Sequence, residues 1–190
     1  MRAAVVTALL FLLASCGSTD GLVPAPTGPV STVAETKEHN PIDVMFLQMA
    51  VAHHKTGIEI VRLAKDRSIR TDIKTLASAI EVTQLSEVDA MLQWLHDWNQ
   101  PESPGTDAQL HANHGGDHST SPEAIAALAA TGPGEFERAF LNLLIAHQHN
   151  AVEIAKFERE GGVNPQSKAL ADRIFQSRTG QISQMLGYLD

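Results

Sequence analysis

The chain has 190 residues, a hydrophobic fraction of 43% and a formal net charge of −8. This length leaves room for a targeting segment and one ordinary domain. The acidic balance argues against a nucleic-acid partner, because binding to phosphate backbones requires basic surfaces. Aromatic residues make up only 5% of the chain, which fits a helical bundle better than a β-sandwich.

Residues 1–15 are typical of a bacterial lipoprotein signal peptide. Arg2 is their only charge, and the apolar run at 3–14 is too short to span a bilayer comfortably. The sequence LASC, which ends at Cys16, resembles a lipobox; an ordinary signal peptide is the alternative. We therefore predict that Cys16 is lipidated and anchors the protein to the extracytoplasmic side of the cell membrane. Because Cys16 is the only cysteine, no thiol remains for a disulfide or a thiolate metal site.

Residues 16–38 are predicted to be the lipidated cysteine and a flexible tether. They are rich in Gly, Pro, Ser and Thr and show no apolar periodicity. Such a segment cannot bury enough apolar surface to offset its chain entropy. The folded domain is therefore expected at residues 39–190.

This domain contains an internal repeat. A shift of 94 positions aligns residues 45–63 with residues 139–157 and stays in register to the end of the chain. Thirteen residues of the first copy are identical in the second, His53 and His147 among them. The repeat indicates duplication of one structural unit.

Each copy is predicted to be a helix hairpin, the first at residues 40–98 and the second at residues 134–190. Asn40 before Pro41 predicts the start of the first helix, and Asn164 before a proline predicts the start of the last. The other predicted segments are a second helix from about Ile69 to Trp98 with Ser68 as its cap, a His-rich loop at 99–121, a short helix at 122–130 and a third long helix from about Gly134 to Glu160.

The fold predicted from these elements is an all-α, antiparallel four-helix bundle made of two duplicated helix hairpins. Each long helix carries an apolar stripe at spacings of three and four residues, which must pack against the other helices. Tight turns within each pair place its helices antiparallel. The longer connection between the pairs favours a ferritin-like crossover.

Polar residues interrupt these apolar stripes. His53 and His147 are equivalent in the repeat, so a pseudo-twofold axis would bring them together near the middle of the bundle. Imidazole binds copper, zinc, iron or nickel, and thioethers favour reduced copper. The candidate metal ligands in the helices are His53, His54, His147, His149, Met49, Glu87, Met91 and Met185.

The alternative is that these histidines are core residues whose ring nitrogens are hydrogen-bonded. Glu87 and Arg178 could then form an ion pair between the two halves. Neighbours on a helix point about 100° apart, so His54 cannot face the axis together with His53.

A second candidate metal site lies in the loop at 99–121. His111, His114 and His118 fall within eight residues, together with Asp117 and two glycines. Such a segment can wrap a divalent ion, and a solvated connector is the alternative.

The domain carries a series of motifs in order: His39-Asn40, Asp43, FLQMAVAHHKTGIEI, Gln84-x-x-Glu87 and HANHGGDH. In their order and spacing it resembles the bacterial domain-of-unknown-function family numbered 305, over about residues 39–190. The resemblance implies a ferritin-like bundle in an exported protein, with copper binding in some members through His-His pairs and methionines. The chain departs from the family pattern at three positions usual for methionine, which are Ala50, Leu144 and Ile154. Gln148 stands where a second histidine is usual. In the last helix, Arg178 and Gln181 replace the usual Gln and Glu.

Two functional interpretations follow, and neither is enzymatic, since no nucleophile arrangement, phosphate loop or paired catalytic carboxylates are recognisable. The first is a membrane-anchored extracytoplasmic lipoprotein that binds or sequesters a transition metal, copper before others. The alternative is a structural or interaction lipoprotein that keeps the fold but has lost most of its ligands.

Overall fold

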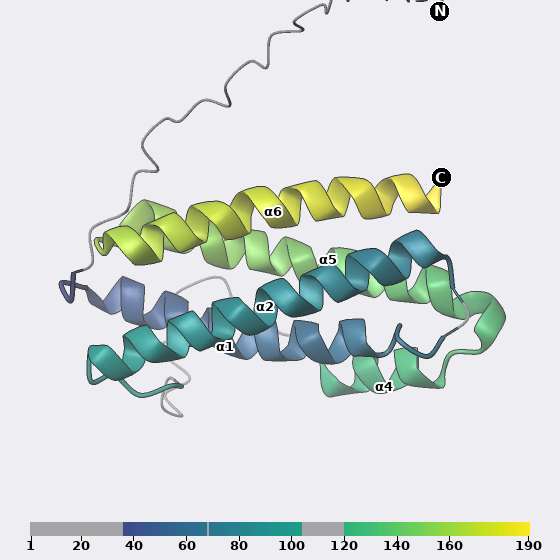
Figure 1. Ribbon diagram of the computed structural model, residues 1–190, viewed down its shortest axis with the longest axis horizontal. Helices are drawn as coiled ribbons and strands as arrows, with labels where there is room; N and C mark the ends of the chain where they lie inside the picture. The colour runs from purple at the N-terminus through teal and green to yellow at the C-terminus, as the bar shows by residue number, and fades with distance from the viewer. Residues whose placement is uncertain (1–35, 68, 104–119) are drawn as a thin grey trace, which may run out of the picture. The chain divides into compact units, whose positions relative to one another are not determined.

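The computed structural model describes residues 36–67, 69–103 and 120–190, all within one compact unit. These residues form five helices and no strand (Figure 1), which confirms the predicted all-α class. The helices are α1 (Pro41–Arg62), α2 (Thr71–Asp97), α4 (Pro122–Ala130), α5 (Pro133–Gly161) and α6 (Pro165–Leu189). None of the helices in these ranges is long and apolar enough to cross a membrane.

Several predicted features lie outside the described residues. They are the signal peptide with Cys16, most of the tether, Ser68 and the loop histidines His111, His114 and His118.

The start of α1 is fixed by a capping box. The side chain of Asn40 accepts hydrogen bonds from the backbone N–H groups of Ile42 and Asp43, and the Asp43 carboxylate accepts one from Asn40 N at 2.7 Å. Asn164 caps α6 with its side chain, which accepts hydrogen bonds from the backbone N–H groups of Gln166 and Ser167, as the sequence predicts. Side-chain caps of this kind satisfy N–H groups that have no partner within the helix.

The sequence prediction for the start of α2 was wrong, because it placed the cap at Ser68. The N-cap residue is Arg70, and its side chain makes no capping hydrogen bond. Instead its backbone N–H donates to the Glu137 carboxylate of α5 at 2.9 Å, and its guanidinium pairs with the same carboxylate. A residue far away in the sequence therefore replaces a local cap.

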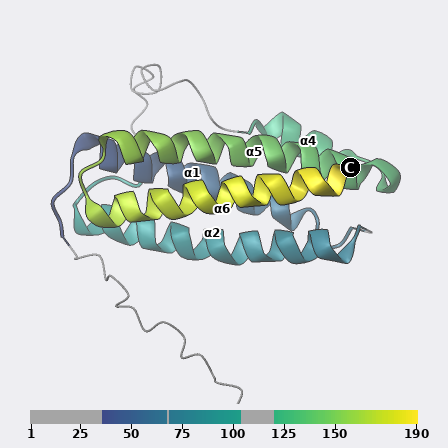
Figure 2. The ribbon, with the colours of Figure 1, turned by 90° about the horizontal axis from the view of Figure 1, so that it is seen from above.

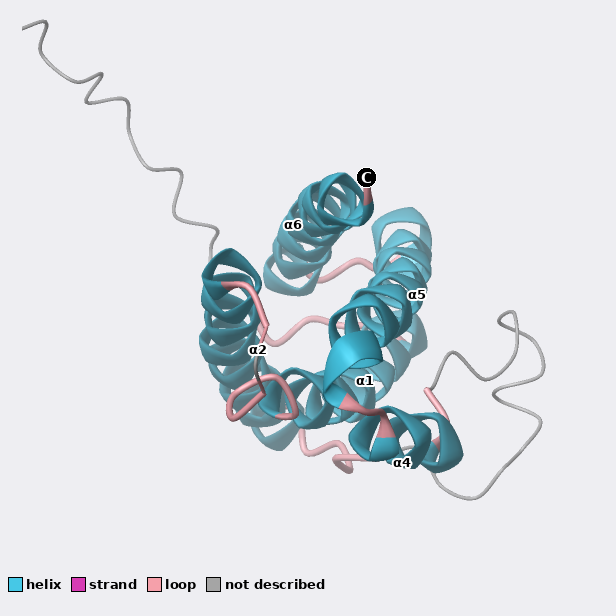
Figure 3. Cartoon of the chain, turned by 90° about the vertical axis from the view of Figure 1, so that its right-hand side faces the viewer, coloured by secondary structure: helices cyan, strands magenta, loops and turns pink. Residues whose placement is uncertain are grey.

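The four long helices lie side by side, and the short α4 packs against α5 (Figures 2 and 3). α1 packs against α2, α5 packs against α6, and α1 and α5 join the two pairs. The N-terminal half of α1 shares a core cluster with the C-terminal half of α5, so these two helices run antiparallel. This first cluster includes Phe46, Leu47, Met91, Leu95, Ile154, Ala155, Leu170 and Ile174.

A second core cluster fills the other end of the domain. It includes Ile60, Ile73, Ile80, Phe136, Phe140, Leu144 and Met185. The buried side chains between the two clusters are mostly polar. The apolar packing that stabilises the fold is thus divided into two parts.

Two reciprocal contacts connect the hairpins. The Asp43 carboxylate on α1 accepts the backbone N–H of Asn164 at 2.9 Å, where α6 begins. The Glu137 carboxylate on α5 accepts the backbone N–H of Arg70 at 2.9 Å, where α2 begins. Glu137 and Asn164 stand 94 positions after Asp43 and Arg70 respectively. The sequence repeat is therefore also present in the contacts.

Asp43 and Glu158 form a buried carboxyl pair at the end of the domain where α1 begins. Neither residue exposes any surface (0%). Asp43 accepts backbone N–H groups from Asn40, Val163 and Asn164. Burial and the nearby Asp43 raise the pKa of Glu158 to about 8, although neither Glu158 oxygen reaches full hydrogen-bonding geometry. Glu158 is therefore neutral at pH 7.

We predict that Glu158→Gln removes a pH dependence of the stability. The pKa of Glu158 rises from 4.5 to about 8 on folding, so its favourable contribution is complete below pH 4.5 and is lost as the pH rises to 8. At pH 8 the variant should exceed the wild type in free energy of unfolding by up to about 4 kcal/mol, because a change of one in a pKa corresponds to about 1.4 kcal/mol. At pH 5 the difference in free energy of unfolding between the variant and the wild type should be smaller. Urea unfolding at both pH values measures this difference, with Glu160→Gln at an exposed position as the control. An equal difference at pH 5 and pH 8 would contradict the prediction.

Candidate metal centre

A layer of polar side chains separates the two core clusters; we call it the polar layer. His53, His54, Gln84, His147, Gln148 and Arg178 are buried in it, and Glu87 and Gln181 are partly buried. α1, α2, α5 and α6 each contribute two of these eight residues. Buried polar groups in an apolar core require partners.

The two equivalent histidines meet in this layer, as the repeat predicts. The rings of His53 and His147 stack with their centroids 3.8 Å apart and their planes 14° apart. His53 Nε2 donates a hydrogen bond to the backbone carbonyl of His147 at 3.1 Å, so its Nδ1 carries the lone pair, and this atom has no partner among the described residues. His147 Nε2 faces the His53 backbone without reaching hydrogen-bonding geometry.

The electrostatics of the layer keep both stacked rings neutral. Burial lowers the pKa of His53 well below its usual range, and the neighbouring His147 and His54 lower it further. Burial also lowers the pKa of His147, to about 3, with additional repulsion from His54 and Arg178. Two neutral imidazoles retain the lone pairs through which histidine binds metals.

Two further residues position His147. Thr120 Oγ1 lies 2.9 Å from His147 Nδ1 and is the first described residue after the His-rich loop segment. On the other side, Gly57 leaves space for the Gln84 amide and for His147 Nε2. A Cβ atom at position 57 would lie 2.5 Å from Gln84 Oε1 and 2.7 Å from His147 Nε2. The sequence analysis missed both Thr120 and Gly57.

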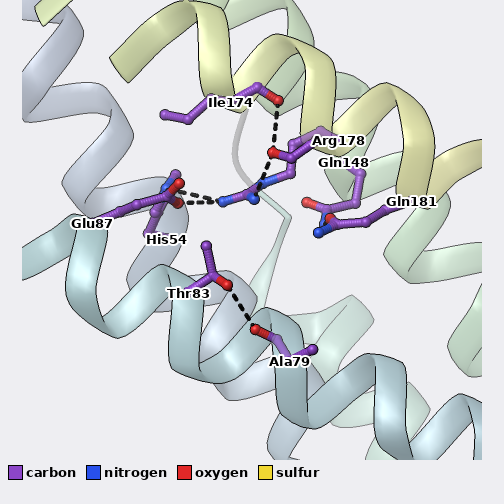
Figure 4. Close-up of polar contacts among 9 residues, drawn as sticks. His54, Ala79, Thr83, Glu87, Gln148, Ile174, Arg178 and Gln181 are labelled. Carbon is purple, nitrogen blue, oxygen red and sulfur yellow. Dashed lines mark hydrogen bonds and ion pairs between the residues drawn. The ribbon is translucent and has the colours of Figure 1, made fainter. Parts of the chain in front are cut away.

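Arg178 of α6 reaches across to Glu87 of α2, which confirms the ion pair considered from the sequence (Figure 4). Arg178 Nη2 lies 2.5 Å from Glu87 Oε2, and His54 Nε2 lies 2.8 Å from the same oxygen. The carboxylate can only accept hydrogen bonds, so His54 Nε2 carries a proton. His54 Nε2 and Arg178 Nη2, 3.3 Å apart, are then both donors to Glu87.

Burial by itself would raise the pKa of Glu87. The hydrogen bond from His54 and the charge of Arg178 outweigh this effect, and the pKa of Glu87 is lowered. Burial lowers the pKa of His54, while its bond to Glu87 opposes the shift. This half of the layer is therefore a carboxylate paired with a guanidinium and a neutral imidazole.

The other half contains the neutral counterpart of the His54–Glu87 pair. Gln148 Nε2 donates to Gln181 Oε1 at 2.5 Å, and these residues are equivalent to His54 and Glu87 in the repeat. In Figure 4 the two glutamines lie beside each other, next to Arg178. The repeat register could have predicted this pair.

Other candidate ligands do not join the polar layer. His149 is exposed on α5. Met91 belongs to the first core cluster and Met185 to the second, while Met49 packs against the first. In the described ranges, no three His, Cys, Asp or Glu side chains form a group that could hold a metal ion. The layer thus brings together His53, His54, His147 and Glu87 but no thioether.

Comparison with known proteins identifies the family. Residues 43–189 match the family model described as domain of unknown function (DUF305). The chain belongs to the DUF305 family. No curated protein matches the sequence significantly.

Solved DUF305 structures share this fold. A fragment from Deinococcus radiodurans is 27% identical with a TM-score of 0.68, covering 79% of this chain and 96% of that one. A DUF305 protein from Streptomyces coelicolor, described as secreted, is 22% identical with a TM-score of 0.68, covering 76% and 88%. CopM in its Cu(I)-bound form is 25% identical with a TM-score of 0.63, covering 77% and 94%.

In this DUF305 protein we predict that Arg178→Met lowers the free energy of unfolding by about 3 kcal/mol. The substitution leaves the Glu87 carboxylate without its cationic partner in a largely buried site. Replacing both members of the pair with methionine should recover most of the loss. Urea unfolding measures all three proteins, with Arg173→Met as an exposed control on the same helix. An Arg178→Met variant as stable as the control would show that the pair is not needed.

We also predict opposite effects for two glycine-to-alanine changes. Gly57→Ala should lower the free energy of unfolding by about 1–3 kcal/mol, because the new methyl group meets His147 and Gln84. Gly180→Ala, with nothing within 4 Å of its new Cβ, should raise it by up to about 1 kcal/mol through helix propensity. Thermal unfolding of both variants checks the signs. Stabilisation by Gly57→Ala would mean that the layer has spare room there.

Proposed function

We propose that this protein binds a transition metal ion, copper before others, on the extracytoplasmic side of a membrane. It sequesters or buffers the ion and carries out no catalysis. The observation that carries the proposal is the stacked pair His53–His147, which is buried and neutral and retains ring nitrogens without a partner among the described residues. Buried nitrogens without partners are costly to a fold, and ligand binding is a reason to keep them.

The chemistry of the layer supports copper or zinc over Mg²⁺ or Ca²⁺. Imidazole nitrogens are borderline ligands that suit copper and zinc, whereas oxygen-rich sites suit the harder ions. Because the two rings stack, their lone pairs do not point at one common atom. One ring must rotate about its side-chain torsions for both histidines to ligate one ion. Among the described residues, His54 offers a further imidazole, 6.2 Å from His53 between ring centroids.

Relatives and sequence features are consistent with this role. CopM, which has been solved with Cu(I) and with Cu(II), is 25–26% identical to this chain. The lipobox at Cys16 supports an anchor in the cell membrane, and His111, His114 and His118 offer an auxiliary grip on the ion. The loop that contains these histidines leads directly to Thr120, which contacts His147.

We further propose that the domain is a ferritin-like antiparallel four-helix bundle formed by duplication of one helix hairpin. The reciprocal contacts of Asp43 and Glu137 support this origin. So do the equivalent pairs His54–Glu87 and Gln148–Gln181.

A second candidate is an interaction or structural lipoprotein without a metal. The pairing of Arg178 with Glu87 favours it, since one half of the layer is already satisfied by the protein's own charges. Gln148 Nε2 likewise donates to Gln181 Oε1, so a neutral amide pair stands at the positions equivalent to His54 and Glu87.

Isothermal titration separates the two candidates. Full-length protein in detergent should bind Cu²⁺ at micromolar concentrations, and the double variant His53→Ala/His147→Ala should lose at least about tenfold in affinity. His149→Ala, an exposed histidine on α5, is the matched control and should bind like the wild type. Absence of binding heat for Cu²⁺ and Zn²⁺ in the wild type would favour the structural role.

A further inference from the structure

Arg178 has an unusual position for a permanently charged side chain. It is 0% exposed and is the largest fully buried side chain in the described part of the domain. At the equivalent place in the first hairpin stands Gln84, a neutral amide. The duplicated framework therefore accepts an uncharged residue at this position, and the charge of Arg178 requires its own explanation.

The guanidinium lies where a bound cation would find its ligands. Arg178 Nη2 contacts Glu87 Oε2 at 2.5 Å and lies 3.3 Å from His54 Nε2. A carboxylate and an imidazole on neighbouring helices form a common donor pair for divalent ions such as zinc. Because arginine stays protonated in proteins, the guanidinium supplies a fixed positive charge to this donor pair.

The charge of Arg178 also acts on the rest of the polar layer. It disfavours the protonated form of all three imidazoles, His53, His54 and His147. The same repulsion opposes any metal ion that approaches the Glu87 side of the layer.

We propose that Arg178 is a built-in cation that closes the Glu87 carboxylate, and with it the His54–Glu87 pair, to metal ions and leaves imidazole nitrogens, first those of His53 and His147, as the open donors. The proposal deepens the proposed function, since it concerns which donors of the same layer are open. Glu87 is the only carboxylate among the described residues of the layer. With Glu87 neutralised by Arg178, the open donors are imidazole nitrogens, a set that suits copper better than ions preferring oxygen ligands. Arg178 is thus a specificity-determining residue.

The test compares Zn²⁺ binding by wild-type and Arg178→Gln protein, full-length in detergent at pH 7, by isothermal titration. Glutamine is the residue at the equivalent position 84, and its amide carries no charge. The variant should bind Zn²⁺ at least about tenfold more tightly than the wild type, because the carboxylate and imidazole become available. No gain in affinity would overturn the proposal.

Two controls separate charge from shape. Arg178→Lys keeps the positive charge and should bind Zn²⁺ like the wild type. Arg178→Gln/His54→Gln removes the imidazole and should return to the wild-type affinity. A gain with lysine equal to that with glutamine, or a gain retained without His54, would overturn the proposal.

If Arg178→Gln does not fold on its own, the variant is tested by thermal unfolding with and without Zn²⁺. Zn²⁺ should then restore the folded state, since binding to the native state stabilises it. A variant that stays unfolded at saturating Zn²⁺ would refute the proposal.

The outcome is distinguishable from that of the proposed function. An Arg178→Gln variant that binds Zn²⁺, beside a wild type that binds no metal, would support the closure of the His54–Glu87 pair by Arg178. It would contradict His53 and His147 as open donors and metal binding as the native function. A wild type that binds copper, beside an Arg178→Gln variant whose Zn²⁺ affinity is unchanged, would support metal binding as the native function and refute the role of Arg178.

Discussion

A permanent charge buried in the middle of an apolar core must be compensated, and the pairing of Arg178 with Glu87 meets this requirement. The pair joins α6 to α2, two helices that otherwise have little backbone contact. It also draws in His54, which donates to the same carboxylate oxygen. The polar layer between the two apolar clusters therefore holds opposite helices in register as well as presenting donor atoms.

Much of the fold could be predicted from the sequence, because its signals are local. Asn40 and Asn164 cap their helices as expected, since each is followed directly by a proline that starts the helix. The start of α2 could not be predicted in this way. The partner of the Arg70 backbone N–H is Glu137, a residue 67 positions away. The neighbouring sequence alone predicts Ser68 as the cap.

For the site, equivalence in the repeat was the informative signal. It did not predict how far along the bundle each equivalent residue lies. Equivalence in the repeat correctly predicted that His53 and His147 meet. Met91 and Met185 are equivalent too, but antiparallel helices carry them to opposite core clusters. Glu158 was missed because a glutamate beside a helix end suggests solvent, although its spacing from Ile154 continues the apolar stripe.

The contacts of Asp43 with Asn164 and of Glu137 with Arg70 have a consequence for how the domain is assembled. The carboxylates of Asp43 and Glu137, which are equivalent in the repeat, each accept a backbone N–H from the other hairpin. Two identical hairpins facing each other about a twofold axis would satisfy both contacts at once. Reciprocal contacts of this kind are those of an isologous interface. The two hairpins differ in the polar layer, where His54 and Glu87 of the first stand at the positions of Gln148 and Gln181 in the second.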